Sequence, residues 1–306
     1  MKKYILRTIL CLFTTCTTVC LAAENEMFFS TQIPFTDDTI YIKALKAWHQ
    51  KRIESLKSEN GWLNLAGLFW LEEGQNTFGT DENNKIVFPK GNAKMGSFTL
   101  NKGEVTIDID PKVEVLADNE RVSKLKIFPS EKTIVLKNGS LRWFIIKRGD
   151  KYGIRLRDLE SDELKHFTEI ETYPIDTNWR IKAKFEPASV GKTIDITDVL
   201  GQVTPQPSPG TLVFNKNGQT YRLDVLDDGD EFFILLADET SAKETYGGGR
   251  FLYTNKPDAD GNVELDFNKA INPPCAFTMF ATCPLPPKQN RLSIVITAGE
   301  KNYGIH

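Results

Sequence analysis

The residue types that acid–base chemistry requires are concentrated between residues 244 and 300. Three carboxylates in this segment, those of Asp266, Glu244 and Glu300, are candidate catalytic groups. A buried carboxyl can acquire the raised pKa that proton transfer near neutral pH requires. The segment also holds three consecutive glycines and two proline-rich stretches, and glycine lets a ligand approach the backbone closely. We therefore expect a polar site here.

Arginines and asparagines in and before this segment are candidates for holding a ligand. Residues 152–158 and 179–185 each alternate between an apolar face and a basic face, as strands do. Guanidinium groups on two converging strands would grip a carboxylate or a phosphate. The competing interpretation is that both strands present their charges to water. The candidate ligand-binding residues are Arg155, Arg157, Arg180, Arg250, Asn268 and Asn290.

Several catalytic and metal-binding signatures are missing from the sequence. There is no Gly-x-Ser-x-Gly, no His-Glu-x-x-His and no Cys-x-x-Cys, and His49, His166 and His306 are far apart. Residues 258–262 resemble half of a calcium loop but lack its distal glutamate, so a turn is expected there. We expect neither a metal nor a cofactor. Whether the protein is an enzyme stays open.

Residues 1–23 have the form of a signal peptide. Basic residues precede a short apolar stretch, and Ala22 and Ala23 supply the small side chains that cleavage requires. We expect an exported protein, periplasmic or extracellular, which meets the membrane only through this segment before cleavage. A retained or lipidated amino terminus is the alternative.

Cleavage would leave Cys275 and Cys283 as the remaining cysteines. In an oxidising compartment we expect them to form a disulfide. A pair of thiols with one reactive member, and a redox activity with it, is the alternative. Cleavage also removes three basic residues from a chain of net charge −3, which leaves a charge of −6. Nucleic-acid binding is not expected, because it depends on neutralising phosphates with basic residues.

From about residue 75 the sequence consists of short alternating segments separated by turn residues. Asn-Gly at 217–218 and Asp-Gly at 260–261 are hairpin signals, because such pairs tolerate positive φ. The second pair is expected to join 250–254 to 263–267 in one hairpin. The pattern predicts a mainly β protein, an antiparallel barrel or sandwich, rather than alternating strands and helices.

One amphipathic helix is expected before the β segments. Apolar residues recur at helical spacing within 38–59, and Arg52 is placed on the exposed side. Pro205, Pro207 and Pro209 alternate in a stiff connection. The expected organisation is a signal peptide at 1–23, a lead-in and helix at 24–60, and a β domain at 61–306 with a candidate subdomain seam at 201–210.

Short motifs give the chain a resemblance to a known family. They are ETYGGGR at 244–250, LDFN at 265–268, NPPCAF at 272–277, CPLPP at 283–287 with Asn290, and AGE at 298–300. Residues 155–158, 173–174 and 179–180 fit the same pattern. The chain resembles the bacterial domain-of-unknown-function family 1684 over residues 60 to 304. The resemblance implies a bacterial protein, commonly exported, and it carries no established activity.

Two functional hypotheses follow. The first is an exported protein with a polar site for a small anionic or saccharide ligand, which it binds or acts on through carboxylate acid–base chemistry. The second is a noncatalytic envelope scaffold or interaction protein, whose polar residues brace loops by bonding backbone groups. The two differ in whether the carboxylates face a cavity or are used in structural hydrogen bonds.

Overall fold

The computed structural model describes residues 38–304. These residues form mostly antiparallel sheet preceded by one long helix, so the expected fold class is confirmed. The predicted signal peptide at 1–23 lies outside the described residues. Within residues 38–304, no helix is both long enough and apolar enough to cross a membrane.

The strands within residues 38–304 form four sheets. A six-stranded sheet has the order β1 (Leu65–Trp70), β11 (Lys151–Asp158), β10 (Leu141–Arg148), β9 (Leu136–Asn138), β6 (Leu116–Ala117), β7 (Glu120–Arg121). A five-stranded sheet has the order β3 (Ile86–Val87), β2 (Gly74–Gly79), β4 (Gly96–Asn101), β5 (Glu104–Ile109), β8 (Lys124–Phe128). A second six-stranded sheet has the order β18 (Arg250–Asn255), β17 (Glu231–Leu236), β16 (Gln219–Asp228), β15 (Gly210–Lys216), β12 (Arg180–Pro187), β19 (Asn262–Asp266). The fourth sheet is the hairpin of β13 (Thr193–Thr197) and β14 (Val203–Pro207).

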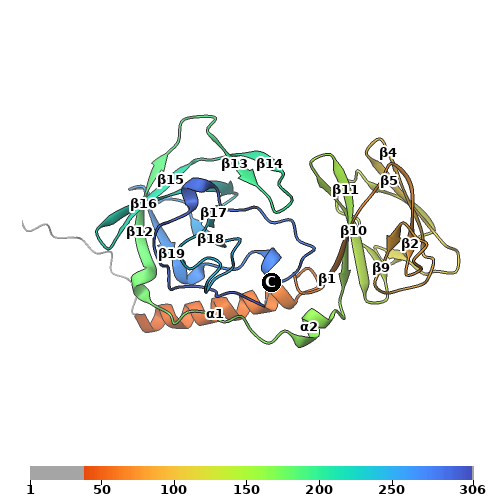
Figure 1. Cartoon of the computed structure of the whole chain (residues 1–306), viewed down its shortest axis with the longest axis horizontal. Coiled ribbons are helices and arrows are strands. Elements are labelled where there is room, and N and C mark those ends of the chain that lie inside the picture. The colour runs from red at the N-terminus through yellow and green to blue at the C-terminus, as the bar shows by residue number, and fades with distance from the viewer. Residues whose placement is uncertain (1–37, 305–306) are drawn as a thin grey trace, which may run out of the picture. The chain divides into compact units, whose positions relative to one another are not determined.

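In the part of the chain that the structure describes, helical segments are few. They are α1 (Asp38–Lys57), α2 (Asp162–His166) and the 3-10 turns Thr177–Trp179, Phe267–Lys269, Pro274–Ala276 and Lys288–Asn290. The longest of them, α1, runs beside the strands of the second six-stranded sheet (Figure 1).

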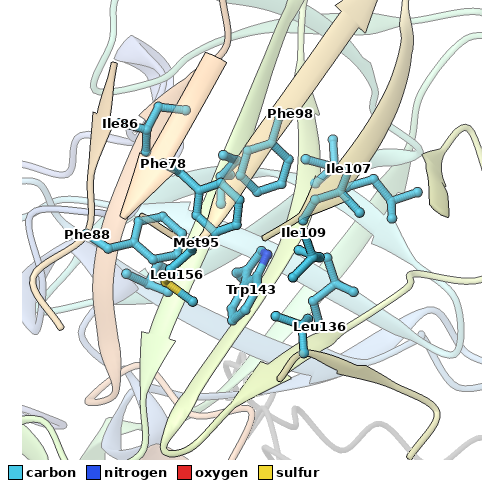
Figure 2. Close-up of a cluster of buried hydrophobic side chains, with 14 of the residues drawn as sticks. Phe78, Ile86, Phe88, Met95, Phe98, Ile107, Ile109, Leu136, Trp143 and Leu156 are labelled. Atoms are coloured by element: carbon cyan, nitrogen blue, oxygen red, sulfur yellow. The ribbon is translucent and has the colours of Figure 1, made fainter. Parts of the chain in front are cut away.

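The first two sheets enclose one hydrophobic core. Trp143 at its centre is fully buried, and the Phe78 and Phe88 rings lie 6.1 and 5.8 Å from it, centroid to centroid (Figure 2). Ile154 and Leu156 of β11 point into this core. Strand alternation therefore places Gly153, Arg155 and Arg157 on the opposite face of the sheet.

The other six-stranded sheet packs around a second, separate hydrophobic core, whose side chains come from residues between Trp179 and Ala298. The Asn217-Gly218 turn between β15 and β16 has φ values of 51° and 77°, as a two-residue hairpin requires. Residues 201–210, where a seam was predicted, include β14, which pairs with β13. The two cores are divided earlier in the chain, between residues 156 and 179.

The expected hairpin between 250–254 and 263–267 does not form a ladder. β18 pairs with β17, and β19 pairs with β12, so these strands are the two ends of one sheet. The sheet curls until its ends meet at a seam, where the Thr254 hydroxyl donates to the Glu264 carbonyl oxygen at 2.7 Å. A turn signal predicts that the chain reverses, but it does not determine which strands pair.

Helix α1 is attached near its start to this sheet and near its end to the segment that follows the last strand. Near its start the Tyr41 hydroxyl donates to the Asp266 carboxylate, and near its end Arg52 pairs with Glu300 at 3.1 Å. The expectation that Arg52 faces solvent is therefore wrong. Its guanidinium also donates to the Asn272 carbonyl oxygen at 3.0 Å. Charge-assisted hydrogen bonds to a buried carboxylate and to a backbone carbonyl stabilise the inward position of the side chain more than contact with water would.

Candidate functional site

Two adjoining hollows lie on the outer side of the curled sheet, and Tyr253 lines both of them. The larger has a volume of about 570 Å³ and the smaller about 230 Å³. We call the two together the Tyr253 groove. Its larger part is lined by Ile196, Gln206, Pro207, Leu226, Asp227, Asp228, Phe233, Tyr253 and Pro284. Its smaller part is lined by Trp48, Glu231, Tyr253, Thr254, Asn255, Glu264, Asp266 and Lys269.

The groove has an aromatic floor held in place by cross-strand packing. Phe233 and Tyr253 are directly opposite on β17 and β18, and their rings stack with centroids 4.9 Å apart. Phe251 meets Phe233 edge to face at 4.9 Å and is itself buried. Tyr253 remains 38% exposed. Burial of the rest of its ring raises the pKa of the Tyr253 hydroxyl, so the phenol stays protonated as a hydrogen-bond donor.

Carboxylates line both parts of the groove. Asp227 and Asp228 lie in the larger part; Glu231, Glu264 and Asp266 lie in the smaller part. Among the lining residues Lys269 is the cation, and its ammonium lies 3.8 Å from the Asp266 carboxylate. The lining is therefore acidic, which disfavours an anionic ligand.

Asp266 stands where the seam, the helix and the groove meet. It is 4% exposed, and its carboxylate accepts from the Tyr41 hydroxyl at 3.0 Å and from the backbone N–H and side-chain amide of Asn268 at 3.1 and 3.0 Å. Burial and the negative charge of Asp266 raise the pKa of Tyr41. The Asp266 carboxylate is thus an acceptor for three donors and helps to hold α1 over the seam.

His49 lies beside this cluster. Its Nε2 is buried without a hydrogen-bond partner among the described residues, and its ring meets Trp48 at 5.2 Å. Burial lowers the pKa of His49, so the neutral ring is favoured. Trp48, one residue earlier, lines the smaller part of the groove.

Glu300 and Arg250 belong to a separate buried network. Glu300 is 1% exposed, pairs with Arg52 and accepts from the Asn272 backbone N–H at 2.6 Å. Burial raises the pKa of Glu300, an effect that Arg52 and the amide donor oppose. Arg250, also 1% exposed, pairs with Asp238 at 3.3 Å and donates to the Ala298 and Ile296 carbonyl oxygens.

Asp266 and Glu300 are held by different turns of α1. Their partners, Tyr41 and Arg52, are eleven residues apart, which is about 16 Å along a helix. Glu244 is exposed, and its negative charge lies near Tyr173, whose pKa is raised to about 12 by burial and by that carboxylate. The structure therefore does not gather the three predicted catalytic carboxylates around one point, and their catalytic roles stay predictions.

The remaining predicted ligand-binding residues have structural partners. Arg180 pairs with Glu264 at 2.8 Å, and its guanidinium lies over the Tyr41 ring at 4.0 Å. Asn268 donates to the Asp176 carbonyl oxygen at 2.9 Å. Asn290 donates to the carbonyl oxygens of Asp224 and Leu235 at 2.8 and 2.9 Å. These contacts brace the loops, as the second hypothesis expects.

Two predicted groups are absent from the residues that line the groove. Arg155 and Arg157 are both buried next to the Trp62 ring. Cys275 and Cys283 form a disulfide with a Cα–Cα separation of 6.1 Å, and both belong to the hydrophobic cluster that also contains Phe233 and Phe251 of the groove floor. No group of three or more His, Cys, Asp or Glu side chains suited to a metal ion occurs within residues 38–304. The 258–262 segment is a turn, in which Asp258 accepts from the Asn262 N–H at 2.7 Å.

Sequence reasoning missed most of the groove. Trp48 lies within the helix predicted at 38–59 and Tyr253 within the strand predicted at 250–254, and neither was expected to line a site. The alternation of Phe251, Tyr253 and Asn255 on one face of β18 was the available signal. Glu231 and Glu264 sit on exposed strand positions, which are charged in most β proteins, so nothing in the sequence distinguished them.

Residues 38–304 form an antiparallel β protein. Its second six-stranded sheet nearly closes under α1, and an aromatic and acidic groove lies at the seam. Residues 165–301 match the family described as "Protein of unknown function (DUF1684)", which is the family that the sequence motifs resemble. Every groove residue except Trp48 lies within the matched segment, whereas Arg155 and Arg157 precede it.

Among solved structures, the chain is similar to the solution NMR structure of an uncharacterised protein of Haloarcula marismortui. The two share 26% identity over 46% of this chain and 80% of the other, with a TM-score of 0.39. No curated protein matches the sequence.

Proposed function

We propose that the protein binds a neutral saccharide, most readily a short oligosaccharide, in the Tyr253 groove. The observation that carries the proposal is the shared lining of the two hollows by one half-exposed tyrosine ring. A ligand longer than one ring unit would stack on Tyr253 and extend into both parts. We also propose that the protein is exported, as its amino-terminal sequence predicts.

The composition of the groove supports a polyhydroxylated ligand. Aromatic faces pack against the apolar C–H faces of sugar rings, and Trp48, Phe233 and Tyr253 provide such faces along the groove. Around them, carboxylates and the amides of Gln206 and Asn255 offer acceptors and donors suited to hydroxyl groups. The excess of carboxylates over cations speaks against the anionic ligand that was the other alternative.

Binding, rather than bond cleavage, is the activity that the contacts favour. Asp266 already accepts hydrogen bonds from Tyr41 and Asn268, and Glu264 is paired with Arg180. Carboxylates held this way are fixed acceptors, and a fixed acceptor selects the orientation of a ligand hydroxyl.

A neutral glycan array followed by titration calorimetry on the best ligand tests the proposal. Tyr253→Ala and Trp48→Ala should each weaken binding about tenfold or more, because each removes a stacking face. Tyr253→Phe keeps the ring and should retain most of the affinity. Met279→Ala, at a residue that is 86% exposed and outside the groove lining, is the matched surface control and should bind as the wild type does.

Two results would contradict the proposal. One is the absence of binding to any neutral glycan on the array at millimolar concentration. The other is binding that Tyr253→Ala and Trp48→Ala leave unchanged, which would place the saccharide elsewhere.

A further inference from the structure

Arg155 is a buried cation that has no counter-ion among residues 38–304. Its side chain comes from β11 on the face opposite the core, and the residue is 6% exposed. Its Nε is buried without a hydrogen-bond partner, and the guanidinium has neither a hydrogen bond nor an ion pair with any of residues 38–304. Among residues 38–304 its guanidinium makes a cation–π contact with the Trp62 ring, with the guanidinium carbon 5.8 Å from the ring centroid.

The charges around Arg155 are positive. Arg157 lies over the same Trp62 ring at 6.0 Å and donates to two neutral oxygens, the Gly61 carbonyl and Asn64 Oδ1. Arg148, the last residue of β10, donates to the Thr282 hydroxyl at 3.2 Å. Burial, together with repulsion from Arg148 and Arg157, lowers the pKa of Arg155 to about 10.

Arg250, another buried arginine of this chain, differs from Arg155 in having partners for its charge. It is more deeply buried than Arg155, and it has Asp238 as its ion-pair partner together with backbone carbonyl acceptors. Buried charges in folded proteins are normally paired, because an isolated one is expensive to remove from water. A counter-charge supplied by a ligand would meet this requirement at Arg155.

We propose that Arg155 and Arg157, with the Trp62 ring, form a second binding site for an oxyanion, the carboxylate or phosphate group of a small ligand. The guanidinium fork matches two oxygens of either group, and the indole face adjoins an unsaturated or apolar part of the ligand. None of these three residues lines the Tyr253 groove, so this site is independent of the saccharide proposal.

Thermal unfolding of the full mature chain in three salts at equal ionic strength tests the site. Inorganic phosphate or acetate should raise the Tm of the wild type in a saturable way relative to chloride. A larger rise with phosphate assigns a phosphate ester, and a larger rise with acetate assigns a carboxylate. The Tyr253→Ala variant should keep the response, which separates failure here from failure of the groove.

Arginine variants identify the residue responsible. Arg155→Met removes the unpaired charge while keeping a long apolar side chain, so its Tm in chloride should equal or exceed that of the wild type and its anion response should vanish. Arg155→Lys keeps the charge but loses the fork, and the anion concentration at half-maximal response should rise about tenfold. Arg121→Met, at an exposed arginine that donates to Pro111, is the matched control and should respond as the wild type does.

The proposal is overturned if neither phosphate nor acetate raises the wild-type Tm above its value in chloride. It is also overturned if Arg155→Met or Arg155→Lys responds with wild-type sensitivity. Should Arg155→Met not fold, the Arg155→Lys titration decides alone.

Discussion

The Tyr41 hydroxyl lies 3.0 Å from both oxygens of the Asp266 carboxylate, and this contact joins the first turns of α1 to the last residue of β19. The helix thereby covers the place where the two end strands of the sheet meet. It also brings Trp48 into the smaller part of the Tyr253 groove. A single buried hydrogen bond thus links the closure of the sheet to the shape of the proposed binding site.

Loss of this hydrogen bond should weaken both stability and binding. Tyr41→Phe leaves a buried carboxylate short of one donor, so the free energy of unfolding should fall by about 1–3 kcal/mol. Urea unfolding measures this, and the same variant should bind the saccharide more weakly because Trp48 is less firmly placed. Tyr246→Phe removes a hydroxyl outside the groove and serves as the control. Unchanged stability in Tyr41→Phe would show that the contact does not hold the helix.

Breaking the buried pair of Arg250 and Asp238 should be more costly. Asp238→Ala leaves the Arg250 charge without its carboxylate and also removes the acceptor of the Ile296 N–H, 2.8 Å away. The expected loss is about 3–5 kcal/mol in the free energy of unfolding. Denaturant titration checks it. If Asp238→Ala unfolds at the wild-type midpoint, Arg250 is not held by this pair, and the contrast with Arg155 loses its basis.

The disulfide should be present in the exported protein and should stabilise it modestly. The bridge closes a loop with a sequence separation of eight residues, which corresponds to about 2.5 kcal/mol in the chain-entropy description. Intact-mass analysis after alkylation should show no labelled thiol at Cys275 or Cys283 without reductant and two labels with it. Labelling of the untreated native protein would instead support the thiol alternative.

His49 should make the protein less stable in mild acid. Burial lowers its folded-state pKa below the ordinary value of 6.5, so the unfolded chain binds the proton more readily. The stability contributed by the neutral ring is present above pH 6.5 and is lost as the pH falls through the folded-state pKa. Between pH 7.5 and 5.5 the wild type should lose up to about 1.4 kcal/mol more than His49→Gln. Equal losses in the two proteins would show that His49 is not protected from protonation.

Periodicity and turn chemistry were sufficient to predict the class of fold. The helix at 38–59 corresponds to α1, and the Asn217-Gly218 turn joins β15 to β16. The pairing of strands could not be predicted in the same way, as the end strands β18 and β19 illustrate. A turn between them reverses the chain, yet long-range packing makes one of them pair with β17 and the other with β12.

The candidate site was predicted in part, because sequence shows which residues are polar but not which of them share a cavity. Asp266 was found through its motif, and it lies in the groove. Arg250 and Glu300 carry equally suggestive side chains, yet buried partners from distant segments, Asp238 and Arg52, engage them. Tyr253 and Trp48 become noticeable only when curling of the sheet and docking of the helix bring them to the same hollow.

A crystal structure of the wild type with the best array ligand tests the central claim most directly. The account predicts one sugar ring stacked on Tyr253, with neighbouring units reaching toward Trp48 on one side and Phe233 on the other. A ligand bound away from Tyr253, or no ligand density at a concentration that saturates binding in solution, would contradict it.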